Sequence, residues 1–117
     1  MDDLYEVSML LDFYGQMLTQ RQFEILDLHY NSDYSLGEIA QHLNISRQGV
    51  YDNIKRGKTA LTALEEKLGL MGRFLKQKDR AGDIMKLLEE IDVSGLDEYG
   101  AKKLKEAQQA VRAIMED

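Results

Sequence analysis

Hydrophobic positions repeat at helical spacing along most of this chain. In its first segment they recur at steps of three and four residues, and this spacing puts them on one face of a helix. The members of this stripe are Leu4, Val7, Leu11, Tyr14 and Leu18, widened by Leu10 and Phe13. The pattern therefore predicts a first helix over residues 3–15, with Gly15 at its exit.

Helix-start signals then return three times within a short stretch. Segments 19–22 and 35–38 each have the spacing of a capping box, in which two side chains satisfy free backbone N–H groups. Ser46 is a further N-cap residue. These signals predict one helix over residues 20–30 and two more that begin after Ser35 and Ser46. The helix over 20–30 is expected to bury Phe23, Leu26 and Tyr30 or their neighbours.

The last two of these helices have the spacing of a helix-turn-helix. The turn between them contains Asn44, a residue that tolerates the left-handed conformation such turns often need. The predicted packing positions are Leu36, Ile39, Ala40 and Leu43 on the first helix, Ile45 under the turn, and Val50 and Ile54 on the second. With these side chains turned inward, the opposite face of the second helix is free to enter a major groove.

That outward face carries the candidate DNA contacts. Gln48 can read adenine and Arg47 can read guanine through paired hydrogen bonds, while the lysines further along are better placed for phosphates. The predicted DNA-binding set is Arg47, Gln48, Tyr51, Asp52, Lys55, Arg56 and Lys58. Tyr51 and Asp52 favour an alternative in which the unit only packs or binds protein, because neither is a strong DNA contact and a carboxylate repels phosphate.

Apolar periodicity continues to the end of the chain. One stripe runs through Val50, Ile54, Gly57, Leu61, Leu64 and Leu68, and it predicts a long helix that ends near Gly69. Two further stripes comprise Phe74, Ala81, Ile84, Leu88 and Ile91, and then Leu104, Ala107, Val111 and Ile114. The expected fold is all-α, with a helix-turn-helix domain over residues 1–70 and a C-terminal helical hairpin over residues 71–117. Such a hairpin cannot bury both apolar faces alone, so it must pack on the front domain or on another subunit. A homodimer is one expectation.

Composition and charge support this prediction and limit it. The chain has no proline and no cysteine, which suits a helical protein in a reducing cytoplasm. It has no apolar run long enough to span a membrane. The net charge is −6, with seven acidic residues against one arginine in residues 1–34. Residues 47–58 carry four basic groups and one acidic group, so the locally basic segment is the one expected to touch DNA.

No catalytic or metal-binding pattern stands out. His29 and His42 lie on different predicted helices, whereas zinc needs three or four ligands at close spacing. Adjacent acidic residues such as Glu65 and Glu66 point in different directions on a helix, and nothing isolates them for acid–base chemistry. We therefore expect no cofactor, no metal ion and no enzyme activity.

Three segments resemble the fourth conserved region of sigma factors of the sigma-seventy type. They are LTQRQFEIL at 18–26, EIA at 38–40 and ISRQGV at 45–50. The resemblance covers about residues 18–64 and implies a domain that reads a promoter element. It also implies that Arg47, Gln48, Tyr51 and Asp52 face the bases, although Tyr51 and Asp52 depart from the basic or amide residues of that pattern.

The whole length more closely resembles the YlxM family of small bacterial helix-turn-helix proteins. The resemblance runs from LYE at 4–6 and DFYG at 12–15 to the C-terminal hairpin. Members are encoded beside the signal recognition particle protein, and this neighbourhood implies a part in that pathway. Two functions stay open: a regulator that binds double-stranded DNA, and an adaptor that binds the particle's protein or RNA.

Overall fold

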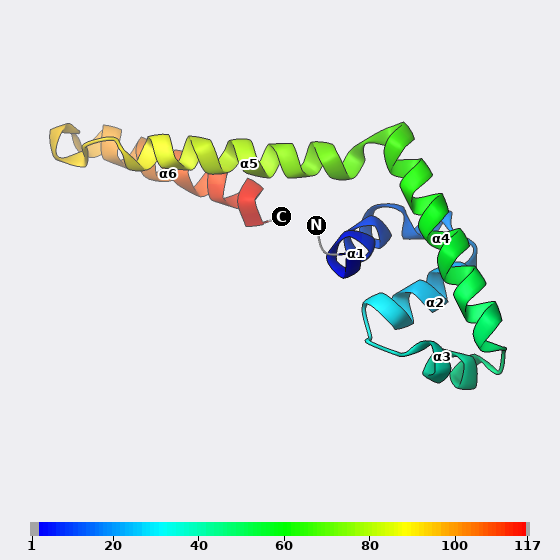
Figure 1. Ribbon diagram of the computed structural model, residues 1–117. Helices are drawn as coiled ribbons and strands as arrows, with labels where there is room; N and C mark the ends of the chain where they lie inside the picture. Colours follow the sequence, from blue (N-terminus) through cyan, green and yellow to red (C-terminus); the bar gives the residue numbers. More distant parts are fainter. Residues whose placement is uncertain (1–2, 117) are drawn as a thin grey trace. The chain divides into compact units, whose positions relative to one another are not determined.

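The computed structural model describes residues 3–116, and all of the regular structure in that range is helical (Figure 1). The elements are α1 (Asp3–Tyr14), the short 3-10 helix η1 (Gly15–Met17), α2 (Gln20–Tyr30), α3 (Leu36–Leu43), α4 (Arg47–Leu68), α5 (Leu70–Glu89), a second 3-10 helix η2 (Val93–Gly95) and α6 (Glu98–Glu116). This confirms the all-α prediction. Within the described range, no helix is long and apolar enough to cross a bilayer. The chain forms two compact units, residues 1–71 and 72–117.

Local hydrogen bonds fix where the short helices begin. Thr19 Oγ1 accepts from the Gln22 N–H at 3.1 Å, and Gln22 Oε1 accepts from the Thr19 N–H at 3.3 Å. The same reciprocal pair recurs at the start of α3 between Ser35 and Glu38. Both capping boxes predicted from the sequence are confirmed, and each satisfies two donors that the helix itself cannot.

In the first unit, α4 is the central element and contacts α1, α2 and α3, which lie along it (Figure 1). The largest fully buried side chains come from all four helices: Tyr14, Ile25, Leu26, Ile39, Val50 and Leu61. Gly57 lies where α4 crosses α2, and a Cβ atom built there would be 2.5 Å from Leu26 Cδ1. The absence of a side chain at Gly57 therefore permits the close crossing of α2 and α4.

Three apolar residues expected inside this unit are exposed, one of them Leu68 at the end of α4, which is 40% exposed. Leu4 lies in the first turn of α1 and is 50% exposed. Phe23 is 39% exposed, and Ile25 and Leu26 form the buried face of α2 instead. The Phe23 ring lies over Gly15, where a Cβ atom would come within 2.7 Å of it. Phe23 therefore covers the α1–α2 connection from outside, because the position of α4 decides which face of α2 is buried.

A buried tyrosine fastens the end of α4 to α1. α4 ends at Gly69, whose φ of +64° is a left-handed conformation that glycine adopts without strain. The fully buried Tyr14 donates its hydroxyl proton to Glu65 Oε1 at 2.6 Å and accepts the Leu70 N–H at 3.0 Å. Met71 N–H also donates to Glu65 Oε1. Burial, and then the bond to Glu65, raise the pKa of Tyr14. Tyr14 and Glu65 thereby satisfy the free donors at the start of α5.

The second unit is the helical hairpin, in which α5 and α6 run side by side (Figure 1). Asp92 closes the connection by accepting from the backbone N–H and the hydroxyl of Ser94, at 3.0 and 2.6 Å. Ala81 and Met85 are buried on α5, whereas α6 has no buried residue in its described range. The predicted inner stripe was wrong at Ile84 and Ile91, which are exposed. The inner face of α5 is rotated away from them, toward Met85.

Candidate nucleic-acid interface

The turn between α3 and α4 has a fixed left-handed geometry. Asn44 has φ +56° and ψ +49°, as the sequence predicts for this position. Ile45 N–H donates to the Ala40 carbonyl at 3.0 Å and closes the end of α3. Ser46 Oγ then accepts the Gly49 N–H at 3.0 Å and starts α4. With Ala40 and Val50 buried between the helices, α3 and α4 form the predicted helix-turn-helix.

The outward face of α4 carries polar side chains in register. Val50, Ile54, Gly57 and Leu61 form its buried face. Gln48, Asp52, Lys55 and Thr59 are spaced by four, three and four residues, so they share the opposite face. A concavity of about 450 Å³ lies on this face, lined by Asp52, Lys55, Arg56 and Thr59. We name the set Arg47, Gln48, Tyr51, Asp52, Lys55 and Arg56 the reading face.

Gln48 and Asp52 form one unit within the reading face. The Gln48 amide donates an N–H to Asp52 Oδ1 at 3.0 Å, one helical turn along α4. A glutamine amide has two N–H donors and one carbonyl, so this bond leaves one donor and the acceptor available. Those are the two groups that a bidentate contact with adenine requires. Asp52 therefore holds one N–H of the Gln48 amide and leaves its other polar groups available.

Arg47 and Lys58 are positioned by their neighbours. The guanidinium of Arg47 lies against the start of α3, where a Cβ atom on Gly37 would be 3.0 Å from its terminal nitrogen. Lys58 extends toward α2, with its ammonium nitrogen 5.9 Å from the centre of the Tyr30 ring. Lys58 therefore extends away from the reading face, although its position three residues after Lys55 suggests from the sequence that the two lysines share a face.

Thr59 is a lining residue that the sequence analysis missed. It borders both the concavity with Lys55 and a neighbouring one of about 340 Å³ with Lys58. Its hydroxyl donates to the Lys55 carbonyl at 2.9 Å, which leaves the oxygen lone pairs as acceptors. The spacing of four residues from Lys55 was the signal that could have found it.

The two histidines have separate structural surroundings. His29 Nδ1 donates to the Tyr34 carbonyl at 2.7 Å, and its ring meets Tyr30 edge-on. His42 packs edge-on against Tyr34, with ring centres 5.9 Å apart, at a concavity shared with Glu38 and Gln41. In the described part of the chain, no three histidine or acidic side chains come together as a metal site would require.

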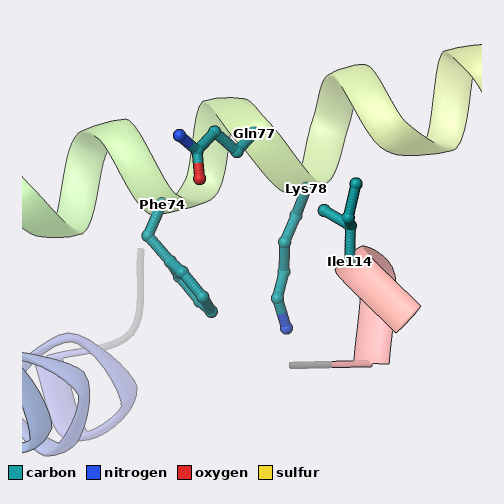
Figure 2. Close-up of a pocket in the computed structure, with 4 residues that line it drawn as sticks. All are labelled: Phe74, Gln77, Lys78 and Ile114. Atoms are coloured by element: carbon teal, nitrogen blue, oxygen red, sulfur yellow. The ribbon is translucent and has the colours of Figure 1, made fainter. Parts of the chain in front are cut away.

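A second kind of concavity lies within the hairpin. Phe74 and Lys78 project from α5 on the side where Ile114 of α6 lies (Figure 2). The Lys78 ammonium is 4.7 Å from the centre of the Phe74 ring. Among the residues that the structure describes, the lining is mainly apolar and includes no carboxylate that could act as an acid or base beside Lys78. This arrangement suits packing more than chemistry.

The capping box at the start of α3 should make the stability of the fold depend on pH. The Ser35 backbone N–H, and then its hydroxyl, hold the pKa of Glu38 below its ordinary value. A carboxyl group with a lowered pKa stabilises the folded state fully at pH values above its ordinary pKa. This stabilisation is lost as the pH falls through the lowered pKa of the folded state. Glu38→Gln keeps the capping box without the titration. We expect wild type to lose more stability than Glu38→Gln between pH 7 and about pH 3. Urea unfolding at both pH values measures this, and parallel losses would contradict it.

A family model described as "Putative helix-turn-helix protein, YlxM / p13 like" (UPF0122) matches residues 1–110. The chain belongs to this family. A UPF0122 protein of Acetivibrio thermocellus is 60% identical over 116 residues, with 99% of each chain covered. One from Lactococcus lactis subsp. lactis is 41% identical over 103 residues, covering 88% of this chain and 87% of its own. One from Desulforamulus reducens is 40% identical over 89 residues, or 76% of each chain.

Membership in the UPF0122 family agrees with the geometry. The matched range includes the whole helix-turn-helix and most of the hairpin. The resemblance to the YlxM family, carried by segments at 4–6 and 12–15, is therefore confirmed.

Proposed function

We propose that this protein is a regulatory helix-turn-helix protein that binds double-stranded DNA with the first turns of α4 in the major groove. The observation that carries the proposal is the reading face, which presents basic and amide side chains opposite a fully buried packing face. An exposed helix held in this way by a support helix matches the docking geometry of helix-turn-helix proteins. Residues 47–58 carry four basic groups and one acidic group, so the reading face can attract phosphates although the chain has a net charge of −6.

The proposal assigns separate roles to the reading face. Arg47 and Gln48, at the start of α4, contact base edges. Lys55 and Arg56, about two turns further along, contact phosphates and fix the register. Asp52 holds Gln48, and Tyr51 offers an exposed aromatic edge to the groove wall, since it is 51% exposed.

The test is binding to duplex DNA from upstream of the protein's own gene, measured by fluorescence anisotropy across a salt series. We expect affinity to fall steeply with salt, and the double variant Lys55→Ala/Arg56→Ala to reduce the salt slope by about one unit for each phosphate interaction removed. Lys102→Ala, an exposed lysine on α6, is the matched control and should leave the slope unchanged. No preference over random duplex, or a response flat with salt, would refute the proposal.

A second candidate is an adaptor of the signal recognition particle pathway, as the YlxM resemblance implies. The charge distribution favours it, because residues 1–34 are strongly acidic and could attract a basic protein. Pull-down with the particle protein and its RNA separates the two candidates. Retention of either ligand after alanine replacement of Arg47, Gln48 and Lys55 would favour the adaptor over the DNA-binding protein.

A further inference from the structure

The outer side of α5 carries an apolar stripe that the hairpin does not use. Ile84, Leu87 and Ile91 follow one another at steps of three and four residues and are 45%, 63% and 43% exposed. Backbone hydrogen bonds from Glu90 to Lys86 and from Ile91 to Leu88 continue the helical path to the end of this stripe. Ala81 and Met85 are the buried positions on the same helix. We call Ile84, Leu87 and Ile91 the outer stripe.

α6 differs from α5 in how its apolar residues are distributed around the helix. On α6 the apolar residues that are at least half-buried lie on a single face, at Leu104, Ala107 and Val111. Its other side carries charged and small residues and the exposed Tyr99 in the first turn, without a run of aliphatic residues. The helix α5 therefore has two apolar sides, of which α6 covers one.

The first half of α5 is basic, and its second half is acidic. Lys78 lies over Phe74 in the hairpin and Asp92 caps Ser94, so neither is counted. Among the other charged residues, all exposed, residues 70–80 contain three basic groups and one acidic group, whereas residues 81–90 contain three acidic groups and one basic group. Such a segment is complementary to a copy of itself laid in the opposite direction, and it repels a copy laid in the same direction. The complementarity selects a second copy of this chain over an unrelated partner.

We propose that two copies of this protein associate through the outer stripes of α5, packed antiparallel about a two-fold axis. The axis passes near residues 85 and 86, so that Ile84 of each copy packs opposite Leu87 of the second copy. This register places the exposed Arg80 of each copy beside the exposed Glu90 of the other, and the contact occurs twice by symmetry. The association is independent of whether the reading face binds DNA.

The first test is sedimentation velocity of the full-length chain. Wild type is expected to be a dimer in the micromolar range. Leu87→Glu should weaken dimerisation by at least about 100-fold, because the variant replaces apolar packing with a buried charge on both sides of the axis. Ala113→Glu, on the outward side of α6, is the matched control and should remain dimeric. A wild-type protein that stays monomeric throughout this range would overturn the proposal.

A charge-exchange experiment separates this interface from loss of folding. Arg80→Glu and Glu90→Lys should each weaken self-association by about tenfold or more, because each variant brings like charges together at both ends of its interface. Mixed in equal amounts, the two variants should form a heterodimer. In that heterodimer the introduced glutamate of one chain meets the introduced lysine of the other, and the unchanged Arg80 meets the unchanged Glu90. Circular dichroism checks that both variants are helical. Failure of the mixture to recover dimer, with both variants folded, would overturn the antiparallel register.

Discussion

Gly57→Ala is expected to destabilise the first unit, although alanine is the better helix former. Inside a helix, alanine gains about 1 kcal/mol over glycine. Here, however, the new Cβ would be 2.5 Å from Leu26 Cδ1 and 3.3 Å from Leu26 Cγ, on a side chain that is fully buried. Overpacking of this kind costs about 1–3 kcal/mol. We expect a net loss of up to about 2 kcal/mol, centred near 1 kcal/mol, and a melting temperature lower by roughly 5 °C.

The matched control for this prediction is Gly82→Ala in the middle of α5. A Cβ atom there would have no heavy atom within 4 Å, so the helix gains propensity without a clash. We expect Gly82→Ala to stabilise by up to about 1 kcal/mol. Thermal unfolding followed by circular dichroism measures both variants. If Gly57→Ala melts at or above the wild-type temperature, Leu26 can move aside and the α2–α4 crossing is looser than its geometry implies.

Gln48→Ala should remove discrimination at one A·T base pair, if the proposed DNA-binding function holds. A bidentate contact between glutamine and adenine distinguishes the right base from the wrong one by about 1–3 kcal/mol, or roughly 5- to 150-fold. The measurement needs two duplexes: a preferred site selected from a randomised library, and the same site with that A·T pair exchanged. We expect Gln48→Ala to bind both duplexes equally well, at the affinity of wild type for the exchanged one.

Variants of Asp52 test how Gln48 is positioned. Asp52→Ala leaves the Gln48 amide without its partner 3.0 Å away, and it also removes a charge that repels phosphate. We expect affinity for both duplexes to rise while the ratio between them falls. Asp52→Asn keeps an oxygen that can accept the same N–H, so it should raise affinity and retain the ratio. An unchanged ratio in Asp52→Ala would show that Asp52 acts through charge alone.

The short helices and the turn could be predicted from the sequence with little error. α2 begins at the capping box of Thr19 and spans Gln20–Tyr30, the range predicted from the sequence. The left-handed Asn44 and the Ser46 cap follow from side chains that bond to backbone within a few residues. Interactions of this range do not depend on the rest of the fold, so the sequence pattern is sufficient to find them.

Most residues of the candidate site could be predicted from the sequence, but the positions and pairings of their side chains could not. Helical spacing alone grouped Lys58 with Lys55, whereas in the structure Lys58 reaches toward Tyr30. The pairing of Gln48 with Asp52 depends on rotamers, which spacing does not specify. Gly49 had no explanation in the sequence. In the structure its N–H bonds to the Ser46 cap, and a Cβ atom would lie 3.2 Å from that hydroxyl.

An all-helical chain, its helix starts, and a helix-turn-helix with a locally basic outer face could all be derived from the amino-acid pattern. The packing of the helices was needed to show which apolar residues enter the core, with Ile25 buried and Phe23 exposed, and which side of α5 faces α6. A cap is a contact between neighbours in the chain, whereas burial depends on helices that are distant in sequence. A stripe of apolar residues indicates the width of the apolar face of a helix. Which part of that face is buried depends on the element that packs against it.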